Sequence, residues 1–156
     1  MKLFPIKKIA INSQFENSDN FTKLKASTEH SDKLITTSTD KLFIGQVTDT
    51  NFKLISSKIG IGAFAVFQFD PKENKNEINV TLNKAFKILF IVFLSLSSVG
   101  VVISIIQIGI PKGIVLLIPF LISLLMFRFV LIGIGFKIST NLGKKALSEI
   151  LGLVNN

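Results

Sequence analysis

The chain has 156 residues, of which 48% are hydrophobic, and it carries 18 Lys and Arg against 10 Asp and Glu, a formal net charge of +8. It contains no Cys, Trp or Tyr and a single His, which excludes disulfide-stapled folds, cysteine nucleophiles and multi-histidine metal sites. Nucleic-acid binders are usually rich in charge, whereas only 18% of these residues are charged. The positive charge therefore needs another explanation.

The first part of the chain, residues 1–83, predicts a small cytosolic β-rich domain. Residues 4–15 are strand-like, and Ser18 is typical of the N-cap of a short helix. Residues 27–39 are rich in Ser and Thr, which indicates a loop with a marginal strand at residues 34–35.

Four antiparallel strands are expected next, because residues 78–83 alternate between apolar and polar side chains and three strand-like segments before them are separated by turn-forming residues. The intervening Asp49-Thr50-Asn51 and the polar residues 70–76 are typical of hairpin turns. Consecutive hairpins give an antiparallel meander, so the expected fold class is α+β. The expected strands span residues 41–48, 52–59, 63–69 and 78–83.

Two long apolar segments follow the strands. Residues 88–111 carry no charge, and residues 113–136 carry only Arg128. A helix needs roughly 20 apolar residues to cross a bilayer core, so we expect transmembrane helices over about residues 88–109 and 113–136, within a membrane domain of residues 84–137. The Gly and Pro residues between the two helices predict a tight turn and an antiparallel hairpin.

Small residues share one face of the first of these helices, namely Ser97, Gly100 and Ser104. Such a face lets helix backbones approach closely in lipid. It can meet the second helix or another copy of the chain, so the expected partners are membrane lipid and a protein partner or homo-oligomer. Pro119 should kink the second helix or be absorbed near its outer end.

Lysines beside the membrane segments predict the orientation of the protein. Five of them flank the ends that lead toward the chain termini, whereas the connecting turn has Lys112 alone. The positive-inside rule then places both termini in the cytoplasm of a multi-pass bacterial inner-membrane protein. These five lysines set the topology or bind anionic lipid headgroups; they are Lys84, Lys87, Lys137, Lys144 and Lys145.

The last part of the chain, residues 138–156, predicts a C-terminal amphipathic helix over residues 139–154. This helix either lies at the membrane interface or packs under the sheet. The residues expected on its apolar side are Leu142, Leu147, Ile150, Leu151 and Val154.

The resulting order of strand, short helix, antiparallel strands, membrane hairpin and terminal helix resembles a set of uncharacterised bacterial membrane proteins common in Bacteroidota. The resemblance covers most of the chain and implies an architecture, a cytosolic β-rich domain joined to a two-helix membrane hairpin, without an activity. The residues that carry it are Phe43-Ile44-Gly45-Gln46-Val47, Phe52-Lys53-Leu54, the Phe-rich residues 64–69 and the alternating residues 77–83.

Arg128 is the one charge inside the apolar segments, and such charges are functional candidates because they are costly in lipid. Its side chain can snorkel toward the cytoplasmic headgroups, or bond to the Ser95 hydroxyl if the hairpin folds about Ile110. The functional alternative is a role in conduction or in binding lipid headgroups.

No motif predicts catalysis, and we expect no catalytic, cofactor or metal-binding residues and no nucleic-acid partner. Gly60-Ile61-Gly62 reads as a turn between strands, and His30, although next to Glu29 and near Asp32, reads as a solvated loop residue. The leading hypothesis is a non-enzymatic membrane protein whose hairpin anchors a cytosolic binding or sensing module. The alternatives are an oligomerising, membrane-permeabilising effector of a bacterial defence or toxin system, and an accessory subunit of a larger membrane complex.

Overall fold

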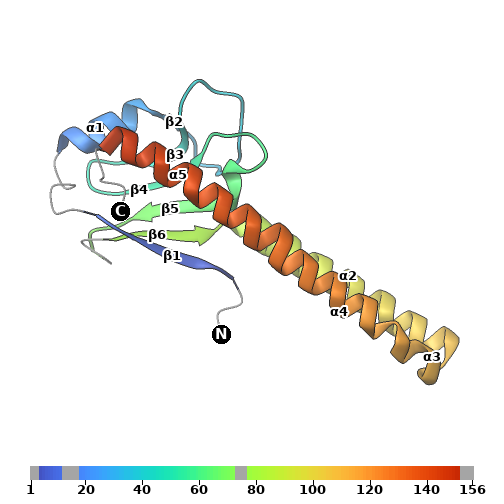
Figure 1. Ribbon diagram of the computed structural model, residues 1–156. Helices are drawn as coiled ribbons and strands as arrows, with labels where there is room; N and C mark the ends of the chain where they lie inside the picture. Colours follow the sequence, from blue (N-terminus) through green and yellow to red (C-terminus); the bar gives the residue numbers. More distant parts are fainter. Residues whose placement is uncertain (1–3, 12–17, 73–76, 152–156) are drawn as a thin grey trace. The chain divides into compact units, whose positions relative to one another are not determined.

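The computed structural model describes residues 4–11, 18–72 and 77–151 and shows an α+β fold with a six-stranded mixed sheet and long helices (Figure 1). The chain divides into two compact units. The β-rich unit consists of Met1–Asn83 together with Phe136–Asn156, and the helical hairpin is Lys84–Gly135. The C-terminal segment therefore belongs to the same unit as the sheet.

The sheet has the strand order β1-β6-β5-β4-β3-β2. All neighbouring strands are antiparallel except β2, which runs parallel to β3. The strands are β1 (Ile6–Ala10), β2 (Thr28–His30), β3 (Phe43–Val47), β4 (Phe52–Ser56), β5 (Ala65–Phe69) and β6 (Glu77–Leu82).

The four expected strands are confirmed as β3 to β6, joined as consecutive antiparallel pairs, but the meander is only part of the sheet. The expected strand at residues 34–35 is wrong, because the edge of the sheet beside β3 is formed by β2 at Thr28–His30 instead. The Thr28 hydroxyl donates to the Leu24 carbonyl at 2.7 Å, and the Phe43 amide donates to the Ser27 carbonyl at 3.2 Å. These bonds hold the residues that follow the first helix beside β3, where they pair with it as β2.

The predicted first strand is present as β1, which is shorter than residues 4–15; residues 12–15 lie outside the described part of the chain, as do residues 73–76 of the expected turn. The turn predicted at Gly60-Ile61-Gly62 is confirmed, since it leads into the short 3-10 helix η2 (Gly62–Phe64) between β4 and β5.

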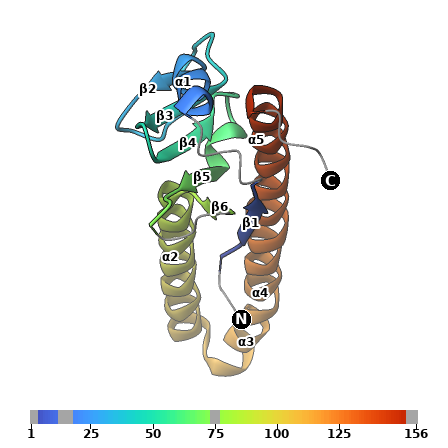
Figure 2. The same ribbon diagram turned by 90° about the vertical axis from the view of Figure 1, so that its left-hand side faces the viewer.

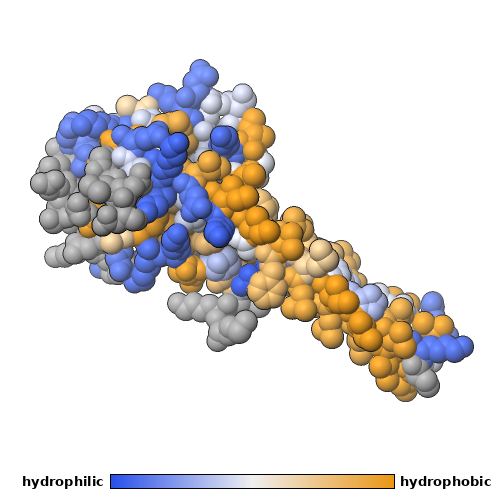
Figure 3. Space-filling view, viewed as in Figure 1, coloured by the Kyte–Doolittle hydropathy of each residue, from blue (hydrophilic) through white to orange (hydrophobic). Residues whose placement is uncertain are grey.

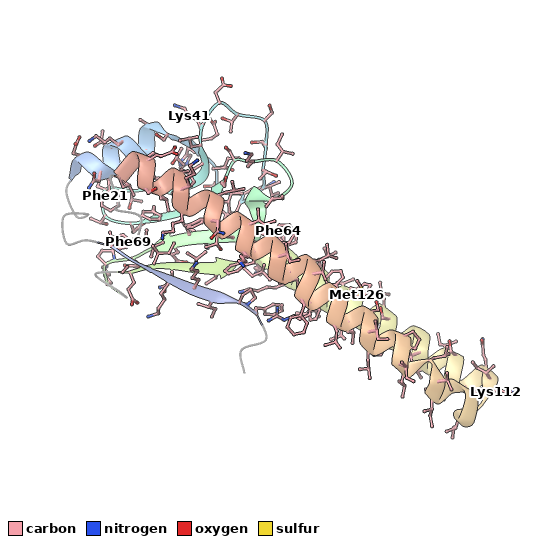
Figure 4. The ribbon with its side chains drawn as sticks, viewed as in Figure 1. Phe21, Lys41, Phe64, Phe69, Lys112 and Met126 are labelled. Atoms are coloured by element: carbon pink, nitrogen blue, oxygen red, sulfur yellow. The ribbon has the colours of Figure 1, made fainter. Side chains whose placement is uncertain are left out.

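One face of the sheet is covered by the short helix α1 (Ser18–Ala26) and by a layer of phenylalanines. The Phe21 ring of α1 lies 6.2 Å from that of Phe69, which in turn stacks on Phe52 at 5.8 Å (Figure 4). Alternation along the strands sends Phe67 and Val80 to this same face. The helix expected after Ser18 is therefore confirmed, and its apolar side closes the core.

The C-terminal helix α5 (Gly135–Leu151) packs on this phenylalanine-covered face, which decides between the two placements left open by the sequence. A Cβ atom at Gly143 would overlap the Phe67 ring, so the missing side chain allows the close approach. The Ser139 hydroxyl accepts from the Ala65 amide at 3.0 Å and donates to the Gly62 carbonyl at 3.1 Å.

The expected apolar side of the C-terminal helix is only partly right. Leu147 is buried, but Leu142, Ile150 and Leu151 are half-buried, and Val154 lies outside the described residues. Small residues take the central contact because the helix lies so close to the sheet. The buried residues of α5 are Phe136, Ser139, Thr140, Gly143 and Leu147.

Two helices of the chain are long and apolar enough to cross a membrane, Lys84–Ile108 and Lys112–Leu151. Only 6% and 0% of their most apolar windows are buried within the chain, whereas the core helices of soluble proteins are mostly buried. Their surfaces are coated by apolar side chains (Figure 3). The segments are α2 (Lys84–Ile108), α3 (Ile110–Val115), α4 (Leu117–Met126) and a π-helix, η3 (Phe127–Ile134), which continues into α5.

The second apolar helix and the C-terminal helix, expected over residues 113–136 and 139–154, are continuous, because the backbone passes from η3 into α5 without a turn. The residues at the junction, Gly133 to Lys137, include no proline, and nothing there ends a helix.

The two arms of the hairpin run antiparallel (Figure 2). The turn lies at Gly109, whose φ of 81° is one that glycine adopts at little cost. Beyond it, the bare backbone of Gly113 packs against Ile105. Pro119 cannot donate to the Val115 carbonyl, and the α-helical pattern is interrupted at Leu116, as the sequence predicts near the outer end.

Candidate functional site

The second face of the sheet carries a straight row of polar side chains. Residues directly opposite each other on neighbouring strands share a face, so the strand register places them side by side. Gln46 pairs with Lys53, Lys53 with Gln68, Gln68 with Asn79, and Asn79 with Lys8. We call this set the polar row: Gln46, Lys53, Gln68, Asn79 and Lys8.

The polar row is open to solvent, because both helices of the β-rich unit lie on the opposite face. Gln46, Lys53 and Lys8 are exposed, and Gln68 and Asn79 are half-buried. Neighbouring strands are about 4.8 Å apart. The row therefore presents five hydrogen-bonding groups at regular intervals across β3, β4, β5, β6 and β1.

Both ends of the polar row are held by acidic residues. The Gln46 amide donates to the Asp32 carboxylate at 2.6 Å, which orients the amide and leaves its oxygen as an acceptor. At the other end, the Lys8 ammonium forms an ion pair with Glu77 at 2.6 Å. Such exposed pairs contribute little stability, typically about 0–1 kcal/mol, so their main effect is to fix side-chain positions.

Lys53 lies in the centre of the polar row with a different environment. Within the described part of the chain its ammonium has no hydrogen-bond or ion-pair partner. Its neighbours in the row, Gln46 and Gln68, are neutral amides that donate and accept. The centre of the row can therefore take an anionic group on Lys53 and polar groups on either side.

Beside the polar row, on the same face of the sheet, a loop covers a set of apolar side chains. Ile44, Ile55 and Val66 form a buried cluster, and Leu34 and Ala63 pack against it. Thus residues 31–42 cover one part of this face and leave the polar row uncovered among the described residues.

Arg128 lies in the π-helix η3 and is half-buried. Its guanidinium lies 5.8 Å from the centre of the Phe129 ring. No bond to Ser95 is formed among the described residues, and the Ser95 hydroxyl instead donates to the Ile91 carbonyl at 2.9 Å. The register of the hairpin is nevertheless close to that expected, since Phe127 stacks on Phe93 at 4.6 Å. Within the described hairpin, Arg128 has no hydrogen-bond or ion-pair partner.

The small residues of α2 do not form one closed interface. Ser97 and Ser104 are half-buried, whereas Gly100 is exposed and a Cβ there would meet nothing within 4 Å. The Ser104 hydroxyl is satisfied by the Gly100 carbonyl at 2.9 Å. Close approach inside the hairpin uses Gly113 instead, a residue that the sequence reasoning took only as part of the turn.

The flanking lysines are distributed over both units. Lys84 and Lys87 open α2, and Lys137, Lys144 and Lys145 lie in α5. Lys84, Lys137 and Lys145 are exposed, and Lys87 and Lys144 are half-buried. Each of these lysines is thus accessible to solvent or to lipid headgroups.

The remaining candidates do not assemble into a chemical site. His30 lies exposed at the end of β2, and the neighbouring carboxylates bond elsewhere, Asp32 to Gln46 and Glu29 to Thr39. No group of three or more metal-ligating side chains occurs in the described residues. A pocket of about 260 Å³ is smaller than the roughly 300–1,000 Å³ typical of ligand sites. It is lined by Phe21, Asp49, Thr50, Phe69 and Pro71.

Comparisons of the chain with protein-family models, with curated proteins and with solved structures yield no match. The geometry of the molecule is thus the basis for any proposal about its function. The polar row was not predicted from the sequence, and the local signal for it is weak: a polar residue such as Gln68 within a strand that is otherwise apolar.

Proposed function

We propose that this chain is a non-enzymatic integral membrane protein whose helical hairpin anchors a cytosolic β-rich module, and that this module binds a protein partner through the polar row. The observation that carries the proposal is the row itself. It combines a central cation, Lys53, which has no ion-pair partner among the described residues, with amide side chains on a face that the protein's own helices leave uncovered.

The chemistry of the polar row favours a protein partner with an acidic, polar surface. An array of amides around the Lys53 ammonium complements carboxylates and peptide groups. Small molecules usually need a concave, mostly apolar pocket that buries most of their surface, whereas the row is flat and exposed. The depletion of aromatic side chains from the row also argues against stacking on nucleic-acid bases.

The exposed apolar surface of α2 and α4 supports the membrane anchor. Large aliphatic side chains such as Leu96, Ile106 and Ile118 are 70%, 77% and 62% exposed, which in water is an aggregation hazard and in lipid is favourable. Lysines are more numerous at the membrane-segment ends that lead toward the chain termini than in the connecting turn. This excess supports a bacterial inner-membrane protein with both termini in the cytoplasm.

Site-specific photo-crosslinking in native membranes tests the proposed binding face. A photoreactive phenylalanine derivative replaces Gln46, Gln68 or Asn79 in the full chain, and matched control variants carry it at the exposed Lys25 or Lys72. The proposal predicts one adduct of constant size from the three row positions and none from the controls. Equal labelling from row and control positions, or no adduct at all, contradicts it.

Reversing the charge of Lys53 tests whether the partner is recognised by its negative charge. Lys53→Glu places a carboxylate in the centre of the row, and repulsion from an acidic partner costs about 1–3 kcal/mol, or roughly 5–150-fold in affinity. The adduct from Gln68 should therefore nearly disappear. Lys53→Gln should have a smaller effect. An adduct that is unchanged in Lys53→Glu would show that the partner is not recognised by its negative charge.

A second candidate function is permeabilisation of the membrane by an oligomer formed through the Ser97/Gly100/Ser104 face. The open space at Gly100 favours it, because that position is not used inside the hairpin. Leakage of an entrapped dye from liposomes containing the full chain would support this candidate, and Gly100→Leu should then abolish the leakage without altering the hairpin. The absence of leakage contradicts it.

A further inference from the structure

Two loops of the β-rich unit carry most of its exposed aliphatic side chains, and the others in the described residues are Ile6 of β1 and Ile138 of α5. Loop 31–42 connects β2 to β3, and loop 57–64 connects β4 to β5. Ile35 and Ile59 are 58% and 71% exposed, and Ile61 is 38% exposed. By contrast, the turn between β3 and β4 at the opposite end of the sheet, residues 48–51, exposes only polar side chains.

Hydrogen bonds tie both loops to Asn83, the residue that immediately precedes α2. The Asn83 side-chain amide donates to the Leu34 carbonyl at 3.0 Å. The Asn83 backbone amide donates to the Phe64 carbonyl at 2.9 Å. A third bond, from the Ser57 amide to the Leu42 carbonyl at 3.0 Å, joins the two loops to each other. The exposed isoleucines therefore lie at the end of the sheet where the chain leaves it for α2.

Chain continuity brings this end of the sheet to the membrane interface if α2 crosses the bilayer. The uncharged run begins one residue after Lys87, and a helix rises about 1.5 Å per residue. Asn83 is then only about 8 Å along the helix from the hydrocarbon boundary, whereas the headgroup layer is about 5–8 Å thick. Side chains on loops bonded to Asn83 are within reach of that layer.

The composition of the loop surface suits an interface between water and lipid. Lys33 and Lys58 are exposed in the same loops as the isoleucines. Long lysine side chains can keep their ammonium groups among anionic headgroups while neighbouring aliphatic groups enter the acyl boundary. Apolar side chains gather at this part of the β-rich unit (Figure 3).

We infer that loops 31–42 and 57–64 form a lipid-contact surface, in which Ile35, Ile59 and Ile61 insert into the headgroup region of the bilayer that the hairpin spans. This inference rests on the proposed membrane anchor. The surface gives the module a second attachment besides the chain itself, so that the module is held against the membrane rather than tumbling above it.

Quenching of a single tryptophan by brominated lipid tests the inference, since the chain has no Trp of its own. The full chain carries Ile59→Trp or Ile35→Trp in proteoliposomes of phosphatidylcholine and phosphatidylglycerol, brominated near the glycerol end of the acyl chains. Asn51→Trp at the far end of the sheet is the matched control, and Val99→Trp in α2 reports insertion of the hairpin. Circular dichroism checks that each variant keeps its fold.

The inference predicts that Ile59→Trp and Ile35→Trp lose most of their emission in brominated vesicles and shift it to shorter wavelength, whereas Asn51→Trp does neither. Quenching of Val99→Trp with both loop variants behaving like Asn51→Trp would overturn the lipid-contact surface and leave the anchor in place. Failure to quench Val99→Trp with deeper brominated lipid would overturn the anchor itself.

Discussion

Replacing Ser139 with alanine should detach the C-terminal helix from the sheet to a measurable extent. The Ser139 hydroxyl is fully buried and bonds both the Ala65 amide and the Gly62 carbonyl. Ser139→Ala deprives two buried backbone groups of this partner. At the lower end of the range for such groups, about 1–1.5 kcal/mol each, and less the better helix propensity of alanine, the net cost is about 2 kcal/mol. Local opening should become roughly 30-fold more frequent.

Hydrogen exchange followed by mass spectrometry on the full chain in detergent or nanodiscs measures this opening directly. Peptides covering residues 62–69 and the middle of α5 should exchange roughly 30-fold faster in Ser139→Ala. The adjacent Thr140 is the matched control, because its buried hydroxyl has no hydrogen-bond partner in the described structure. Thr140→Val should leave exchange unchanged or slow it. Equal exchange in wild type and Ser139→Ala would refute the docking of α5 on the sheet.

The remaining predictions concern close packing and the intramembrane cation. Gly143→Val should lower the free energy of unfolding by about 1–3 kcal/mol in denaturant titrations followed by circular dichroism, because the new side chain overlaps Phe67; the exposed Asn141→Val controls for helix propensity, and an equal effect of both changes would contradict the reasoning. Arg128→Leu should keep or raise the amount of protein in the membrane fraction, since Arg128 has no hydrogen-bond partner within the described hairpin and leucine inserts about 3 kcal/mol more favourably. A fall in abundance on immunoblots would assign Arg128 a structural role.

The parts of the fold that the sequence predicts are those with a strong local pattern. β6 follows from its alternating side chains, β3 to β5 follow from strand-like segments between turn residues, and the helices of the hairpin follow from the length of their apolar runs. Each of these signals is contained in the segment itself. The positions of Gly109 and Pro119 likewise act on the neighbouring residues only.

Long-range pairing accounts for what the sequence did not predict. β2 has three residues, Thr28 to His30, without an apolar alternation, and only its bonds to β3 make it a strand. The pairing of β1 with β6 joins Lys8 to Asn79, which nothing near either residue indicates. The polar row depends on all these registers at once, so its residues are visible in the sequence but their alignment is not.

Hydrophobic periodicity pointed to a different side of the C-terminal helix for a related reason. A helix that lies very close to a sheet needs small residues at the contact, so Ser139 and Gly143 occupy positions where the pattern predicts leucine or isoleucine. The buried hydroxyl of Ser139 also depends on partners at Gly62 and Ala65, far away in the sequence.

Cysteine accessibility in intact cells tests the anchored cytosolic module most directly, because the chain has no native Cys. Single variants Lys112→Cys in the hairpin turn, Asn51→Cys in the sheet and Ser148→Cys in α5 are treated with a membrane-impermeant maleimide before and after permeabilisation. Our account predicts labelling of Lys112→Cys in intact cells and of the other two only after permeabilisation. Labelling of Asn51→Cys or Ser148→Cys in intact cells, or recovery of the chain in the soluble fraction, would contradict it.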